Sequence, residues 1–152
     1  MSENVKVVVR FRPFNKKEKD SDSKSINIDT NRGVIDIVAP DKNHQFIFDN
    51  VFDGNTTQEI VFNSVAKNAV EWVVEGYNST IFSYGNTGSG KSFTMFGHEN
   101  GSKELRGIIP RACDSLFENI KKRQDVLEYS IKCSFLEIYR EHIRDLLSQE
   151  AE

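Results

Sequence analysis

The chain has 152 residues, of which 38% are hydrophobic and 28% charged, and its formal net charge is −3. This length and composition indicate one soluble globular domain and exclude a disordered or fibrous protein. No apolar run approaches the roughly 18 residues of a membrane span, and the polar N-terminus is unlike a secretory signal peptide. The slight acidic excess argues against a nucleic-acid binder. We therefore expect neither membrane insertion nor a nucleic-acid partner.

The two cysteines, Cys113 and Cys133, form no CxxC pair and no metal-ligand pattern. Two isolated thiols in apolar surroundings are typical of a reducing compartment, where cysteine serves in packing. We expect no disulfide framework.

The N-terminal third of the chain favours β-structure. Val5–Phe11 is a β-branched run that stops before Pro13, and its apolar residues on both faces predict a buried strand. A polar loop over Asn15–Ser25 follows. Three short strand candidates come next, separated by good turn residues: Ser25–Asp29, Val34–Val38 and His44–Phe48. This spacing predicts a small antiparallel meander.

A helix is predicted over Gln58–Glu75, where apolar residues recur on one face with a period of 3.6. Thr56 and Glu59 have the spacing of a capping box, which would satisfy two amides at the start of the helix. Gly76 is a natural residue to end it.

The remaining sequence alternates between the two kinds of element. Ser79–Tyr84 predicts a strand, and a helix is expected to begin near Lys91. Pro110 suits the first turn of a second amphipathic helix that ends in the basic residues 121–123. Alternation of apolar and polar residues over 127–135 predicts a further strand with one solvated face.

One motif carries chemistry, because residues 85–92 fit the phosphate-binding P-loop pattern G-x-x-x-x-G-K-[ST]: Gly85, Asn86, Thr87, Gly88, Ser89, Gly90, Lys91 and Ser92. The glycines allow backbone turns whose amides form a nest for anions, and a following helix adds its positive end. Lys91 is the expected catalytic cation for the β- and γ-phosphates, and the Ser92 hydroxyl is the expected Mg²⁺ ligand. The motif predicts a nucleoside triphosphate site.

The sequence around this loop resembles the kinesin motor domain. The matching segments run in one order along nearly the whole chain: Val7–Pro13, Phe48–Phe52, Gly76–Gly85, Phe93–Met95, Gly107–Arg111, Ser134–Tyr139 and Asp145–Leu147. The resemblance implies a three-layer α/β P-loop NTPase-type fold with a central, mostly parallel or mixed sheet, beside the small N-terminal meander. It also implies MgATP as the cofactor and microtubules (tubulin) as the partner, in the cytoplasmic cytoskeleton.

The resemblance also assigns residues to the adenine pocket. Arg10, Arg12 and Pro13 match positions that line this pocket in kinesins, and Phe93 stands where the family places a residue against the base. An aromatic ring there could stack on the adenine. Asn86 and Ser92 depart from the usual Gln and Thr, but both keep the chemical type.

Two later segments of the family pattern are not found. The sequence has no Ser-Ser-Arg and no Asp followed three residues later by Gly, which mark the family's two switch segments. Phosphoryl transfer needs a group that orients the attacking water. We therefore expect residues 1–152 to be the N-terminal half of a motor domain, without most of the microtubule-binding half. We expect these 152 residues to bind nucleotide but to hydrolyse it negligibly.

Two alternatives stay open at this stage. A small GTPase would carry its P-loop directly after the first strand, whereas here the loop begins at residue 85, behind a meander and a long helix. The second alternative is a non-catalytic protein that senses nucleotide or binds a partner, such as the product of a truncated gene. The basic residues 121–123 could contact tubulin, but cations at the end of a helix are the simpler interpretation.

Overall fold

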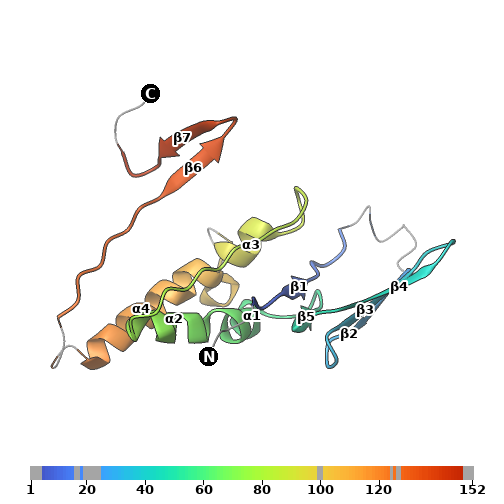
Figure 1. Cartoon of the computed structure of the whole chain (residues 1–152), viewed down its shortest axis with the longest axis horizontal. Helices are drawn as coiled ribbons and strands as arrows, with labels where there is room; N and C mark the ends of the chain where they lie inside the picture. Colours follow the sequence, from blue (N-terminus) through green and yellow to red (C-terminus); the bar gives the residue numbers. More distant parts are fainter. Residues whose placement is uncertain are drawn as a thin grey trace. The chain divides into compact units, whose positions relative to one another are not determined.

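A computed structural model describes residues 5–15, 18, 25–98, 101–123, 125 and 128–148. The chain forms two compact units, residues 1–119 and 120–152. Figure 1 shows the elements in chain order, coloured from the N-terminus to the C-terminus. Most of the predicted loop at 15–25, and position 127 of the predicted last strand, lie outside the described residues. No helix in the described part of the chain is long and apolar enough to cross a membrane.

The first strand belongs to a parallel pair. β1 (Val8–Arg10) pairs with β5 (Asn50–Phe52), with Val9 opposite Val51. β1 is shorter than the predicted run and only partly buried, and Val7, which precedes it within that run, is 48% exposed. The prediction of a buried strand over Val5–Phe11 is therefore wrong in both its length and its burial. The sequence pattern did not reveal β5, because a three-residue strand has too few residues to show a period.

The predicted antiparallel meander is confirmed. β2 (Ile26–Asp29), β3 (Val34–Val38) and β4 (Asn43–Ile47) form a three-stranded sheet in the order β2–β3–β4 (Figure 1). Val34 and Ile35 of β3 are buried, whereas all of β4 is exposed. The meander is a separate sheet from the parallel pair.

The predicted long helix is two helices. α1 (Gln58–Val65) and α2 (Lys67–Val74) are separated at Ala66, whose φ of −113° departs from the usual helical value of about −63° although the residue stays in the right-handed region. Ala66 is fully buried, so the interruption sits inside the core. A single-helix prediction over Gln58–Glu75 is therefore wrong at this residue, because periodicity reports which face is apolar and not whether the backbone is continuous.

The two ends of this helical region differ in how well they were predicted. Thr57, and not Thr56, caps α1: its hydroxyl accepts a hydrogen bond from the Ile60 amide at 3.3 Å. The Thr56 hydroxyl instead donates to the Asp53 carboxylate at 2.8 Å. The cap therefore lies one residue after the predicted position, and the predicted capping box is wrong, because Ile60, three residues after Thr57, has no polar side chain to reach back. Gly76 ends α2 as predicted, with φ of +97° and the Tyr77 amide bonded to the Trp72 carbonyl.

The predicted strand at Ser79–Tyr84 is not a strand. These residues pair with no β-ladder among the described residues, and Phe82 and Tyr84 are 77% and 95% exposed. Strand formation needs a neighbour to complete the backbone hydrogen bonds, and local sequence cannot report whether a neighbour is present.

Three helical elements follow: α3 (Lys91–Met95), the 3-10 helix η2 (Lys103–Leu105) and α4 (Ile108–Arg123). Pro110 lies in the first turn of α4, as predicted. The basic residues 121–123 form its last turn, where their charge offsets the negative end of the helix dipole.

The core of the first unit joins β5, α1 and the start of α4. Its buried members are Phe52, Val61, Phe62, Ala66 and Ile108. Met95 from α3 and Ile81 from the extended segment pack at its edge. The residues on either side of the P-loop are thereby fixed to the same core.

The second unit contains a β-hairpin. β6 (Leu136–Tyr139) and β7 (His142–Asp145) pair antiparallel across the two-residue turn Arg140–Glu141 (Figure 1). Both turn residues have positive φ, of 47° and 68°, which is the conformation that a tight type I′ hairpin requires. The alternating stretch predicted as a strand, of which 128–135 is described, forms no strand. As at Ser79–Tyr84, the alternation predicted a strand, but no neighbouring strand among the described residues pairs with it.

Both cysteines are free thiols. Cys113 and Cys133 are exposed, so the predicted packing role is wrong.

Candidate functional site

The loop at 85–92 turns at its three glycines. Gly85, Gly88 and Gly90 all have positive φ, of 152°, 81° and 99°. A side chain at Gly85 would be strained in two ways, because a Cβ there would also lie 2.7 Å from the Ser89 hydroxyl oxygen. Gly90 is the residue before α3, so the loop leads directly into that helix.

Lys91 lies within the loop that contains it. Its ammonium donates to the carbonyl oxygens of Gly85 at 2.7 Å and Asn86 at 3.0 Å. The side chain therefore spans the turn that the glycines create. A compact cation on a flexible stem can exchange these carbonyls for phosphate oxygens.

The residues at the start of α3 present polar groups to solvent. Ser92 and most of the loop residues are exposed. The amides of the first helical residues have no partner inside a helix, so they are available to an anion. α3 has only five residues, so the loop amides and Lys91 contribute more than its dipole. No group of three or more acidic, histidine or cysteine side chains in the described ranges could hold a metal alone.

Arg10 lies against the residue that follows the loop. Its guanidinium carbon is 5.3 Å from the centre of the Phe93 ring, and its nitrogens donate to Gln58, Thr94 and the Thr56 carbonyl. Partial burial lowers the pKa of Arg10, which nevertheless stays protonated at neutral pH. The structure thus brings together Arg10 and Phe93, two of the predicted pocket residues.

Arg12 and Pro13 are placed differently. The Arg12 Cβ lies 3.8 Å from where a Cβ on Gly90 would be, so its backbone is beside the loop. Its guanidinium, however, forms an ion pair with Glu18. That pair raises the pKa of Arg12 and, together with the Asn15 amide, lowers the pKa of Glu18. The Pro13 backbone lies against Gly54. The pocket roles of Arg10, Arg12, Pro13 and Phe93 stay predictions.

One residue near the site was not predicted. Gln58, at the start of α1, is 4% exposed and contacts both Arg10 and the carbonyl of Phe93. Polar residues at helix starts are usually exposed, and no local sequence signal indicates that this one is buried.

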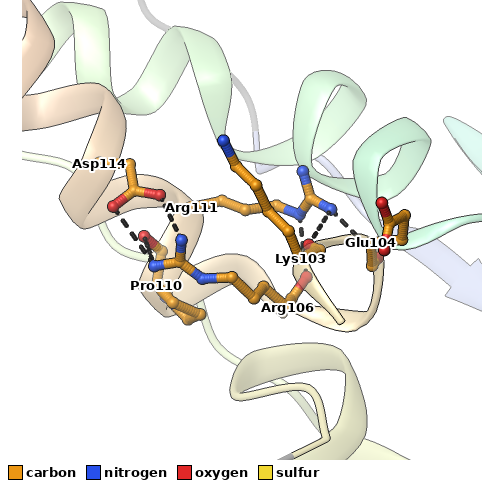
Figure 2. Close-up of polar contacts among 6 residues, drawn as sticks. All are labelled: Lys103, Glu104, Arg106, Pro110, Arg111 and Asp114. Carbon is orange, nitrogen blue, oxygen red and sulfur yellow. Dashed lines mark hydrogen bonds and ion pairs between the residues drawn. The ribbon is translucent and has the colours of Figure 1, made fainter. Parts of the chain in front are cut away.

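The segment after α3 is held by two arginines, which Figure 2 shows in close-up. Arg111 donates to the carbonyls of Lys103, Glu104 and Arg106 at 2.9–3.2 Å. Arg106 forms an ion pair with Asp114 of α4 at 2.7 Å. These contacts fix the carbonyl end of η2 to α4, as helix ends need partners for their last carbonyls.

Comparison with known proteins identifies the family. The sequence pattern described as the kinesin motor domain matches residues 10–152. The chain is 46% identical over 147 residues to kinesin-related protein 3 of Dictyostelium discoideum, covering 95% of this chain and 12% of that protein. It is 41% identical over 150 residues to the kinesin heavy chain of Syncephalastrum racemosum, covering 98% of this chain and 16% of that protein.

A solved structure described as that of a fast kinesin superposes with a TM-score of 0.86 at 37% identity. The match covers 95% of this chain and 41% of the solved one. It confirms the predicted α/β P-loop NTPase-type fold class. The predicted central sheet is wrong for the described residues, whose strands form two separate pairs and the three-stranded meander, because Ser79–Tyr84 and 128–135 join no ladder. The chain spans less than a fifth of the length of the two curated relatives named above. By sequence and by fold, the chain belongs to the kinesin motor domain family.

Proposed function

We propose that this chain forms the ATP-binding part of a microtubule motor, in which ATP hydrolysis drives movement along microtubules. The observation that carries the proposal is the P-loop at 85–92, with its three positive-φ glycines and Lys91 across the turn. Membership of the kinesin family supports ATP over other nucleotides and tubulin as the partner. The same membership supports a cytoplasmic, microtubule-associated location.

Different groups of the loop would bind different parts of the triphosphate. The backbone amides of the loop and of the first residues of α3 would donate to the phosphate oxygens. Lys91 would neutralise charge on the β- and γ-phosphates, and the exposed Ser92 hydroxyl would complete a Mg²⁺ site together with those phosphates. The magnesium would then offset the charge that develops on the phosphates during transfer.

On the base side, Arg10 and Phe93 are the best-supported residues. Phe93 is 39% exposed, so part of its ring remains accessible for stacking on adenine. Arg12 and Pro13 would border the same pocket. Arg12 would first have to be released from Glu18, if its guanidinium is to reach the base.

Substitution of Lys91 tests the proposal directly. We expect Lys91→Ala to weaken binding of a fluorescent ATP analogue by about tenfold to a hundredfold, because it removes a charge-assisted contact to phosphate. Lys67→Ala, at an exposed position at the start of α2, is the matched control and should bind like the parent chain. Equal affinity of the Lys91→Ala and parent chains for ATP would contradict the P-loop assignment, and a preference for GTP over ATP would contradict the kinesin assignment of the nucleotide.

We further propose that the 152-residue chain binds nucleotide but hydrolyses it negligibly. The sequence contains neither Ser-Ser-Arg nor Asp-x-x-Gly, so it offers no recognisable group to orient the attacking water. Steady-state phosphate release, measured with and without microtubules, tests this. Robust stimulated turnover would overturn it, whereas nucleotide binding without turnover would also be consistent with a non-catalytic binding module.

A further inference from the structure

Gln58 is the one buried polar side chain among the described residues, at 4% exposure. It stands at the first position of α1, where a polar side chain is normally solvated. Burying an amide costs free energy unless its hydrogen bonds are restored inside the protein. Gln58 can therefore be buried only if protein groups replace the hydrogen bonds that its amide would make with water.

Both ends of the Gln58 amide are used. Its oxygen accepts from an Arg10 nitrogen at 2.7 Å, and its nitrogen donates to the carbonyls of Phe93 at 2.6 Å and Leu105 at 3.3 Å. Arginine can only donate and a carbonyl can only accept, so the orientation of this amide follows from its partners. No other uncharged side chain of this length offers an acceptor and two donors together.

The partners of Gln58 come from three separate parts of the chain. Arg10 ends β1, Phe93 lies in α3 directly after the P-loop, and Leu105 ends η2. The η2 carbonyls are themselves held by Arg111 (Figure 2). Gln58 is thus bonded to Leu105 in the segment that Arg111 holds, and to Arg10 and Phe93, the predicted base-binding residues.

Arg10 is oriented as a result. Its guanidinium is held by Gln58, by the Thr94 hydroxyl at 3.0 Å and by the Thr56 carbonyl at 3.3 Å. Held in this way it lies over one face of the Phe93 ring, 5.3 Å from the centre. A cation over an aromatic face is attracted to it by the charge distribution of the ring. Phe93 therefore contacts this network both through its carbonyl, which accepts from Gln58, and through its ring, which faces Arg10.

We propose that Gln58 is a positioning residue for the nucleobase: it holds Arg10 and Phe93 in the arrangement that lets the Phe93 ring stack on the base. This inference rests on the proposed function, since it takes the base to bind beside Phe93. It assigns Gln58 to base affinity and not to phosphate affinity, because the hydrogen bonds of its side chain go to Arg10, Phe93 and Leu105, none of which belongs to the P-loop at 85–92. Only the base-dependent part of binding should change when Gln58 is replaced.

The test compares ATP with inorganic tripolyphosphate, which has the phosphates but no base. We expect Gln58→Met, of similar length and without hydrogen bonds, to weaken ATP binding to the 152-residue chain by about tenfold. Tripolyphosphate affinity should stay within about twofold, as the P-loop is unaltered. Gln45→Met, at an exposed position of β4, is the matched control and should change neither affinity.

Two further variants separate positioning from folding. Thr94→Val removes a second acceptor of Arg10 at a partly exposed site, and it should weaken ATP binding in the same direction by a smaller factor. If circular dichroism shows that Gln58→Met does not fold, the affinities of Thr94→Val for ATP and tripolyphosphate provide the test instead. In a Phe93→Leu background, adding Gln58→Met should change ATP affinity little, because the ring through which Gln58 acts is gone.

The outcomes are distinct. Equal losses of ATP and tripolyphosphate affinity, or an unchanged ATP affinity in folded Gln58→Met, would overturn the role of Gln58 and leave the proposed function standing. A parent chain that binds neither ligand would overturn the nucleotide site itself, and this inference with it.

Discussion

At the scale of single residues, the two arginines of the N-terminal segment show how partners decide what a side chain is free to do. Arg10 is half-buried and held by uncharged groups, whereas Arg12 is exposed and paired with Glu18. The two residues are equivalent in the sequence pattern. In the structure, Arg10 contributes to a fixed surface beside Phe93, and Arg12 is bound by an ion pair that salt and acid can release.

The Arg12–Glu18 pair leads to a pH-dependent prediction. Hydrogen bonding from Arg12 and then from the Asn15 amide lowers the pKa of Glu18 in the folded chain. A lowered folded pKa adds stability above the unfolded value of about 4.3, and this stability is lost as the pH falls through the folded pKa. Glu18→Gln should therefore lower the melting temperature slightly at pH 7, and the difference from the parent chain should be smaller at pH 3, because it is lost as the pH falls through the folded pKa.

Thermal melts at both pH values, with and without 1 M salt, provide the measurement. The matched control is Glu71→Gln, at an exposed position of α2, which should show no such pH dependence. A difference between Glu18→Gln and the parent chain that persists in acid would show that the effect is not electrostatic.

At the scale of elements, the segment between α3 and α4 is constrained by close backbone contacts. Gly97 and Arg106 form an isolated antiparallel bridge, and Gly97 has φ of +91°. A Cβ on Gly97 would lie 2.1 Å from the Leu105 carbonyl oxygen. This is the same segment whose Leu105 carbonyl accepts from Gln58, so its backbone path bears on the site.

Gly97→Ala should therefore destabilise the chain by about 3 kcal/mol, near the upper end for single substitutions, because backbone strain is added to a steric clash. Gly76→Ala separates these two causes. Gly76 has a similar φ of +97°, but a Cβ added there would meet no atom within 4 Å, so only the strain of about 1 kcal/mol should remain. Urea denaturation measures both, and equal losses would contradict the role of the close contact.

At the scale of the whole molecule, large apolar side chains are exposed in both units. In the hairpin, Ile138 and Ile143 lie opposite each other and are 69% and 66% exposed. Exposed apolar strands of this kind are prone to pair with other chains. We expect the 152-residue chain to self-associate at high concentration.

Ile138→Lys should reduce that association, because a charge on the exposed face of β6 opposes pairing. Asn31→Lys adds the same charge at an exposed turn and is the control for net charge. Sedimentation velocity of the variants at matched concentrations gives the measurement. Equal association of Ile138→Lys and the parent chain would show that the hairpin face is not the contact.

The success of sequence reasoning differed with the range of the interactions involved. The P-loop pattern, the meander turns and the end of α2 at Gly76 depend on local backbone chemistry, and they were predicted. Ser79–Tyr84 and 128–135 were predicted as strands from periodicity, but pairing is non-local and they have no ladder among the described residues. Gln58 was missed for the same reason, since its burial depends on Arg10, Phe93 and Leu105, which are distant in sequence.

The contacts of Lys91 affect how much of the lysine–phosphate interaction is measured by the loss of affinity in Lys91→Ala. The Lys91 ammonium donates to two carbonyls, those of Gly85 and Asn86. A phosphate must therefore compete with the loop's own oxygens, and binding exchanges one set of partners for another. Lys91→Ala alters the reference state as well as the complex, so the measured loss of affinity is a lower bound on the lysine–phosphate interaction.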